Sequence, residues 1–171
     1  MMNNESAVFT VKAIGVIHSA FTHPKEAPIQ PAFAKGAEGV VEVFEPYAAA
    51  LKDLDGFERI WLIFYCDRAA EWKPLSKPYL DTVERGLFAT RAPARPNPIG
   101  ISSVRLMRIE GNRLYVQDID ALDGTPLLDI KPYSGKFDTF LTQRNGWMDA
   151  VDTSDPKADG RFWKPQTENK Q

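Results

Sequence analysis

Clustered prolines restrict this chain more than any other sequence feature. Pro24, Pro28 and Pro31 fall within eight residues, and a second cluster stiffens the segment Arg91–Pro98. Proline has no backbone N–H and a fixed φ, so the first cluster excludes both a helix and an inner strand. That segment is therefore expected to be an ordered or lid-like loop, with regular structure confined to short stretches elsewhere.

Short apolar or alternating runs predict six or seven strands. The run Ile60–Cys66 has no polar residue, which predicts a strand covered on both faces. Gly111 and Asn112 separate two runs and suit a hairpin turn. A change of apolar parity in the first arm predicts a bulge near Ser102 and Ser103. The expected strands are Val8–Ile17, Val40–Phe44, Phe57–Cys66, Leu87–Thr90, Ile99–Ile109, Leu114–Ile119 and Leu127–Ile130.

Helical patterns are few. Pro46–Asp55 has a proline suited to the first helical position and a glycine just after it, and Phe137, Phe140 and Leu141 have helical spacing. The chain is therefore expected to form a mainly β fold, a closed or barrel-like antiparallel domain with one or two short helices. We place this domain at residues 1–150 and expect residues 151–171 to form a partly irregular tail.

The composition excludes several classes of protein. A net charge of −2 argues against a protein that coats nucleic acid by bulk electrostatics. Cys66 is the single cysteine, which excludes an intrachain disulfide and a thiolate zinc cluster, and with His18 and His23 as the only histidines no metal site is expected. No apolar leader or bilayer-length run is present, so we expect a cytoplasmic protein without membrane contact.

Common cofactor and nucleophile motifs are also absent. The chain has no GxGxxG dinucleotide fingerprint, no GxxxxGK[ST] phosphate loop and no GxSxG nucleophile elbow. Cys66 has no evident base beside it and is expected in the core. An ordinary doubly wound nucleotide fold is therefore not indicated.

The segment Ala89–Gly100 carries candidate binding groups. Arg91 and Arg95 present planar guanidinium groups, which suit carboxylates and phosphates, and Asn97 can both donate and accept hydrogen bonds. The prolines between them reduce the entropy lost on holding one shape. This pattern fits a preformed pocket for an anionic or mixed-polarity ligand and equally a rigid corner whose arginines pair with nearby acids.

The acidic segment Asp118–Tyr133 contains the turn Asp123-Gly-Thr-Pro126, whose backbone groups could read an adenine edge. Asp118 and Asp120 are expected on a solvated strand face. Asp129, Lys131 and Tyr133 are harder to explain as surface residues alone. Asp67-Arg68 suits either a solvated pair or a ligand contact at the mouth of a barrel. By its chemistry alone, Pro28-Ile-Gln-Pro31 is expected to be a stiff connection.

Four blocks together resemble the TsaA-like (YaeB-like, TrmO) family across Val11–Tyr133. They are Ile14-Gly-Val-Ile-His-Ser, Leu54-Asp-Gly-Phe-Glu-Arg-Ile-Trp-Leu, Phe88-Ala-Thr-Arg-Ala-Pro-Ala-Arg-Pro-Asn-Pro-Ile-Gly and Asp123-Gly-Thr-Pro-Leu-Leu-Asp-Ile-Lys-Pro-Tyr. The resemblance implies a β-barrel methyltransferase that binds S-adenosylmethionine, methylates threonylcarbamoyl-adenosine beside the tRNA anticodon, and is a homodimer. The cofactor residues that it implies are Pro28, Ile29, Gln30, Asp67, Arg68, Arg91, Asp123, Gly124, Thr125 and Pro126.

For the methyl acceptor, the candidate contacts are Arg95, Asn97, Lys131 and Tyr133, and no catalytic base is assigned. Asp67-Arg68 stands where characterised members tend to carry His-Gln, and only a short irregular segment follows the last motif. Two alternatives therefore stay open: a module that binds S-adenosylmethionine without turnover, and a methyltransferase acting on a small molecule.

Overall fold

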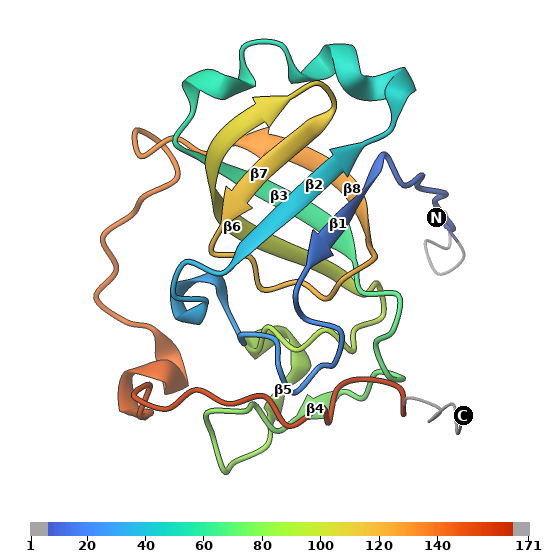
Figure 1. Cartoon of the computed structure of the whole chain (residues 1–171). Coiled ribbons are helices and arrows are strands. Elements are labelled where there is room, and N and C mark those ends of the chain that lie inside the picture. Colours follow the sequence, from blue (N-terminus) through green and yellow to red (C-terminus); the bar gives the residue numbers. More distant parts are fainter. Residues whose placement is uncertain (1–6, 166–171) are drawn as a thin grey trace, which may run out of the picture.

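The computed structural model describes residues 7–165 of the chain. Six strands close into an antiparallel barrel in the order β1-β2-β7-β6-β3-β8 (Figure 1). The barrel strands are β1 (Gly15–Ser19), β2 (Glu38–Val43), β3 (Arg59–Tyr65), β6 (Ile99–Glu110), β7 (Arg113–Gln117) and β8 (Thr125–Pro132). Two short strands, β4 (Leu75–Ser76) and β5 (Arg85–Gly86), pair beneath the barrel. The mainly β, barrel-like fold predicted from the sequence is confirmed.

The helices of the described chain are short 3-10 helices. They are η2 (Pro31–Phe33), η3 (Glu45–Leu51), η4 (Leu54–Gly56), η5 (Leu87–Ala89) and η6 (Gly146–Ala150). The single helix expected over Pro46–Asp55 is divided, because Asp53 takes a left-handed φ of 66°. The helix expected around Phe137, Phe140 and Leu141 does not form. These three side chains are exposed, so no packed face stabilises a helix there.

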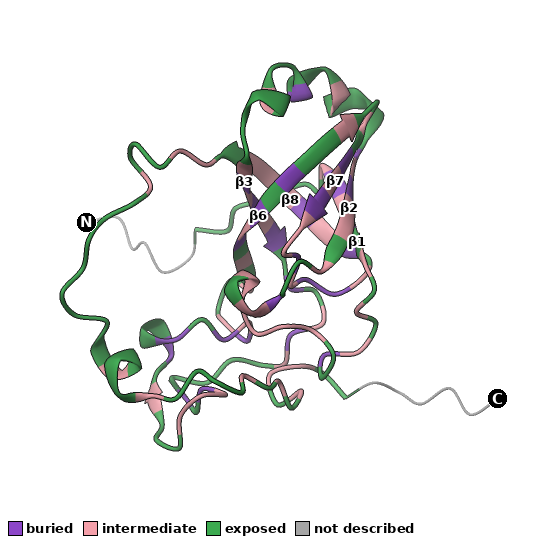
Figure 2. Cartoon of the chain, turned by 60° about the vertical axis from the view of Figure 1, so that its left-hand side comes forward, coloured by how far each residue is buried: buried purple, intermediate pink, exposed green. Residues whose placement is uncertain are grey.

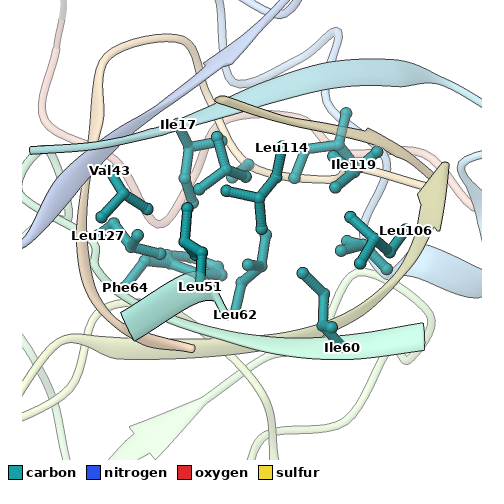
Figure 3. Close-up of a cluster of buried hydrophobic side chains, with 14 of the residues drawn as sticks. Ile17, Val43, Leu51, Ile60, Leu62, Phe64, Leu106, Leu114, Ile119 and Leu127 are labelled. Atoms are coloured by element: carbon teal, nitrogen blue, oxygen red, sulfur yellow. The ribbon is translucent and has the colours of Figure 1, made fainter. Parts of the chain in front are cut away.

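The barrel interior is filled by alternate residues of each strand (Figure 3). On β3, Ile60 and Leu62 are fully buried, whereas Tyr65 is exposed on the outer face. The expectation that this strand is covered on both faces was therefore wrong. An uninterrupted apolar run was compatible with either arrangement, and here the outer side chains are only partly covered.

Three strand predictions need correction. β1 begins at Gly15, and residues 7–14 contain no strand. The segment expected as a strand at Leu87–Thr90 is largely the helix η5. No bulge occurs at Ser102, because Ile99 and Ile101 simply point outward; the register against β7 shifts between Leu106 and Arg108.

The predicted β6–β7 hairpin around Gly111 and Asn112 is confirmed. Gly111 supplies the positive φ of 60°, and the Asn112 side chain donates a 2.7 Å hydrogen bond to the Val43 carbonyl of β2. The backbone carbonyl of Asn112 in turn accepts the Val43 N–H at 2.9 Å. One turn residue therefore fixes the hairpin to the neighbouring strand.

Replacing Asn112 with alanine removes the side-chain amide, so the hydrogen bond to the Val43 carbonyl is lost. We expect the free energy of unfolding to fall by about 1 kcal/mol, the usual net value of such a bond. Urea unfolding of the variant and the wild type measures this loss of stability. Arg113→Ala, an exposed change in the same turn region, is the control and should alter stability by less than about 0.5 kcal/mol. Equal losses in both variants would contradict this role for Asn112.

The loops gather at one end of the barrel, where β1 and β3 finish and β6 and β8 begin (Figure 1). We call this the lower end. The segment after β8 leaves the opposite end, passes along the outside with largely exposed residues, and crosses beneath the lower end (Figures 1 and 2).

That segment is tied to the loop after β3. Phe162 accepts a hydrogen bond from the Ala70 N–H at 2.9 Å, Lys164 N–H donates to the Arg68 carbonyl at 2.9 Å, and Trp163 forms a bridge with Ala69. The described part of the expected tail therefore packs on the barrel domain of its own chain. The expected fraying of Pro165–Gln171 falls almost entirely outside the described residues.

Candidate functional site

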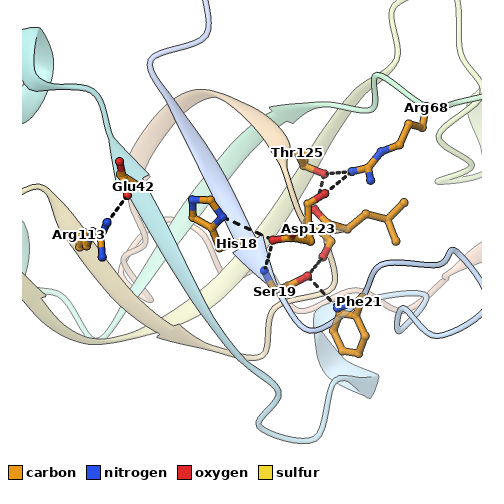
Figure 4. Close-up of polar contacts among 10 residues, drawn as sticks. His18, Ser19, Phe21, Glu42, Arg68, Arg113, Asp123 and Thr125 are labelled. Atoms are coloured by element: carbon orange, nitrogen blue, oxygen red, sulfur yellow. Dashed lines mark hydrogen bonds and ion pairs between the residues drawn. The ribbon is translucent and has the colours of Figure 1, made fainter.

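Arg68 joins two of the predicted cofactor motifs (Figure 4). Its Nη2 donates to the Asp123 carbonyl at 2.8 Å and to Thr125 Oγ1 at 3.1 Å. Asp67 lies beside it, with a carboxylate oxygen 3.4 Å from Arg68 Nε. That Nε is buried and forms no hydrogen bond within the described residues. The loop after β3 and the turn before β8 thus form one polar surface, in which Arg68 Nε has an ion-pair partner in Asp67 but makes no hydrogen bond.

The Asp123–Pro126 turn is held by β1. The Asp123 carboxylate accepts the Ser19 N–H at 3.2 Å and lies 3.5 Å from His18 Nδ1 (Figure 4). The N–H groups of Asp123 and Gly124 donate to Phe21 and Ile17 carbonyls. These N–H groups are therefore used inside the chain and are not free to read an adenine edge. A contact of the turn's carbonyl groups with an adenine edge stays a prediction. The Asp123 carboxylate remains partly exposed for a ligand.

The proline-rich loops meet at the same end. Arg91 Nη1 donates to Gln30 Oε1 at 2.6 Å, which brings the Pro28-Ile29-Gln30 motif onto the arginine-proline loop. The Cys66 N–H donates to the Pro98 carbonyl at 2.7 Å and links that loop to the end of β3. The residues implied for the cofactor therefore lie on loops of the lower end or, for Thr125 and Pro126, at the start of β8. The sequence prediction grouped them correctly in space, while their contact with a cofactor stays a prediction.

The predicted acceptor residues are divided between the two ends. Arg95 turns back on its own loop, where Nη1 donates to the Thr90 carbonyl at 3.0 Å, and Asn97 is exposed nearby. Lys131 instead lies near the far end of β8 and pairs with Asp129 at 2.8 Å. Six residues of strand separate Thr125 from Lys131, or about 20 Å. Within one chain, the four predicted acceptor residues therefore do not lie close together.

Tyr133 shares the far end with Lys131. Its ring packs on Trp61 with centroids 5.5 Å apart, and its hydroxyl lies 3.0 Å from Thr139 Oγ1. These contacts hold the ring against the barrel. The acceptor role of Lys131 and Tyr133 stays a prediction. Both residues lie far from the cofactor motifs of the same chain.

Asp120 is the residue that sequence reasoning missed. Its carboxylate accepts a 2.6 Å hydrogen bond from Ser102 Oγ, and burial raises its pKa to about 7. Asp118 is not on a strand face either: it follows the end of β7, is partly buried and pairs with Arg59 at 3.0 Å. β7 ends before both residues and Asp118 has a φ of 67°, so strand alternation could not locate either side chain.

Cys66 is buried at the same end, as expected for a core residue. Burial and the nearby Asp120 and Asp67 carboxylates raise the pKa of its thiol to about 12. The thiol is therefore protonated at neutral pH and is a poor nucleophile.

Two hollows are lined mainly by other parts of the chain, although the second includes His18 and Ser19, which contact Asp123. One, of about 320 Å³, lies under η3 and η4 and is lined by residues such as Tyr47, Leu54 and Phe57. The other, of about 510 Å³, runs over β1, β2, β6 and β7 beside Tyr115 and Arg108. Neither hollow includes Arg68, Arg91 or Thr125. The largest cavities and the predicted cofactor residues therefore point to different places on the barrel. We favour the loops, because two hydrogen-bonded junctions converge there.

Residues 7–165 offer no candidate for a metal cluster or for a membrane-spanning helix. That part of the chain contains no group of three metal-ligating side chains. None of its helices has the length and apolar character of a membrane span.

Comparison with known proteins agrees with the motifs. Residues 16–139 match the tRNA-methyltransferase O N-terminal domain. A probable S-adenosyl-L-methionine-binding protein of Pyrococcus abyssi is 51% identical over 89% of this chain and 84% of its own length. A tRNA (adenine(37)-N6)-methyltransferase of Escherichia coli is 36% identical over 73% of this chain and 57% of its own length.

A solved structure shows the same fold. TrmO from Pseudomonas aeruginosa superposes with a TM-score of 0.69 at 39% identity, covering 82% of this chain and 63% of that one. The chain thus spans less than two thirds of TrmO and of the Escherichia coli protein. The family predicted from the four motifs is confirmed: the chain belongs to the tRNA-methyltransferase O N-terminal domain family.

Proposed function

We propose that this chain is an S-adenosylmethionine-dependent methyltransferase that acts on an adenosine of the tRNA anticodon loop, with threonylcarbamoyl-adenosine as acceptor. The observation that carries the proposal is the convergence at the lower end, where Arg68 joins Asp123 and Thr125 and where Arg91 joins Gln30. The family membership of residues 16–139 supports the same activity.

The side chains at the lower end fit the chemical groups of the cofactor. Arg91 is exposed and can hold the cofactor carboxylate in a forked ion pair. The Asp67 and Asp123 carboxylates can accept hydrogen bonds from its ammonium or ribose hydroxyls. Arg68 Nε is buried beside this surface, paired with the Asp67 carboxylate at 3.4 Å but without a hydrogen bond. When bound, S-adenosylmethionine supplies an activated methyl group on a sulfonium, so the residues mainly bind and orient the reactants.

The acceptor site is proposed to use Arg95 and Asn97 from the lower end and Lys131 and Tyr133 from the far end. Such a site requires two copies of the chain, because these pairs are separated within one. We therefore propose a homodimer. Exposed apolar side chains on neighbouring strands β3 and β6, Tyr65, Ile99 and Ile101, flank the loops of the lower end and support this assembly.

The dimer is tested by sedimentation of the wild-type chain and of Ile101→Asp, which places a charge on that face. The proposal expects a dimer for the wild type and a monomer for the variant, with unchanged circular dichroism. A monomeric wild type would overturn it. A cytoplasmic location, proposed from the tRNA substrate, is tested by cell fractionation, and recovery outside the cytoplasm would overturn it.

The activity is tested by transfer of a labelled methyl group from S-adenosylmethionine to purified tRNA that carries threonylcarbamoyl-adenosine, with an unmodified transcript as the comparison. Nucleoside digestion should show the label as an N6-methylated adenosine derivative in the modified tRNA. Cofactor binding without label in any RNA would instead indicate a binding module. Label only in small molecules, with weak and salt-insensitive tRNA binding, would indicate the small-molecule alternative.

A further inference from the structure

Asp120 lies where the chain crosses the lower mouth of the barrel. The neighbouring Ile119, Ala121 and Leu122 are buried, whereas Asp120 itself stays partly exposed. Ser102 projects into the barrel from β6 with 2% of its surface exposed, and its Oγ donates to Asp120 Oδ1 at 2.6 Å. The carboxylate is thus fixed from inside the barrel and largely desolvated, while the residue as a whole stays partly exposed at the mouth.

The charged and titratable groups around Asp120 come from three elements. Arg91 on the arginine-proline loop lowers the pKa of Asp120, as does the hydrogen bond from Ser102 on β6. Cys66 at the end of β3 is protonated and adds no charge, with Asp67 and Arg68 next to it. Loss of hydration outweighs these effects and leaves the Asp120 pKa at about 7. Such a carboxylate exchanges a proton readily at neutral pH.

The proposed methyl acceptor needs a group of this kind. An exocyclic adenine nitrogen that carries hydrogen must lose a proton when it gains a methyl group. Its lone pair is delocalised into the attached π system, so removal of that proton assists the attack. Asp120 shares the lower end with Arg91, which is assigned to the cofactor, and therefore lies near the place where the methyl group is delivered.

We propose that Asp120 is the proton acceptor of the methyl transfer and that Ser102 is its positioning residue. The acceptor nitrogen forms a bond to the methyl carbon while the carbon–sulfur bond breaks, and the bonding pair stays on sulfur. The proton of the nitrogen moves to the Asp120 carboxylate, which later releases it to water. This inference rests on the proposed function and assigns its general base.

The first test replaces Asp120 with asparagine, which keeps the size and removes the basic oxygen. We expect kcat for tRNA methylation to fall by about 10²- to 10⁴-fold, with S-adenosylmethionine affinity by calorimetry and thermal stability close to wild type. Asp155→Asn, an exposed carboxylate paired with Lys157, should retain full activity. An unchanged kcat in Asp120→Asn would overturn the proposal, as would loss of cofactor affinity, which would make Asp120 a cofactor ligand.

The second test uses Ser102→Ala. Removing the hydrogen bond withdraws an interaction that lowers the pKa of Asp120, so that pKa should rise. The acid limb of the kcat–pH profile should therefore move to higher pH. Carbon-13 NMR of the Asp120 carboxyl should report titration near neutral pH in the wild type and the same upward shift in the variant, without any turnover.

Titration of Asp120 at an ordinary carboxylate pKa, or an acid limb that Ser102→Ala leaves in place, would overturn the assignment. A wild-type protein that methylates no tRNA would overturn the proposed function together with this proposal. Wild-type methylation that Asp120→Asn leaves intact would overturn the assignment of Asp120 alone.

Discussion

Replacing Arg68 with alanine is expected to weaken S-adenosylmethionine binding by about ten- to a hundredfold, because one side chain ties two of the cofactor motifs together. Its Nη2 donates to the Asp123 carbonyl and to Thr125 Oγ1. Loss of hydrogen bonds from a charged donor costs about 1 to 3 kcal/mol, and each 1.4 kcal/mol is about tenfold in affinity. Titration calorimetry of the purified variant measures the change.

The matched control is Arg113→Ala on β7. Arg113 also pairs with a carboxylate, Glu42 at 2.8 Å, but on the exposed barrel wall away from the lower end. The Arg113→Ala variant should therefore bind the cofactor with the same affinity as the wild type. Equal affinities for Arg68→Ala and the wild type would remove Arg68 from the cofactor site.

Leu62→Ala is expected to lower the free energy of unfolding by about 2 to 5 kcal/mol. Leu62 is fully buried at the centre of β3, the strand that pairs with both β6 and β8 (Figure 3). Truncation leaves a cavity inside a closed barrel, whose hydrogen-bonded wall cannot collapse easily. Urea unfolding followed by tryptophan fluorescence provides the measurement.

Leu141→Ala is the control for this change, since the Leu141 side chain is fully exposed at 102%. The same atoms are removed there without a cavity, so stability should change by less than about 0.5 kcal/mol. A loss at Leu141 as large as that at Leu62 would contradict the burial pattern described for the barrel.

The fold was predictable where side-chain periodicity and turn chemistry agreed. The β6–β7 hairpin followed from two apolar runs around Gly111-Asn112, and β2 and β8 from short apolar runs. Predictions failed where tertiary packing decides the outcome. Phe137, Phe140 and Leu141 had helical spacing but no surface to pack on, and the outer side chains of β3 could not be told from buried ones by hydrophobicity alone.

The candidate site was predictable as a set of motifs and less so as a geometry. The arginine-proline and Asp-Gly-Thr-Pro blocks identified the family and the end of the barrel that matters. No local pattern could show that Lys131 and Tyr133 lie at the other end, because that depends on the direction of β8 in the barrel. Asp120 was missed because it lies beyond the end of β7, where its burial and its contact with Ser102 of β6 depend on how distant segments pack together.

The most direct test of the account is titration calorimetry of S-adenosylmethionine into the wild-type chain, Arg91→Ala and Arg105→Ala. Arg91 contacts Gln30 at the lower end, whereas Arg105 forms an exposed pair with Glu58 elsewhere on the barrel. A cofactor site at the lower end predicts micromolar binding by the wild type and Arg105→Ala and clearly weaker binding by Arg91→Ala. Absence of heat and of thermal stabilisation in the wild type, or equal affinity in Arg91→Ala, would contradict a cofactor site at the lower end.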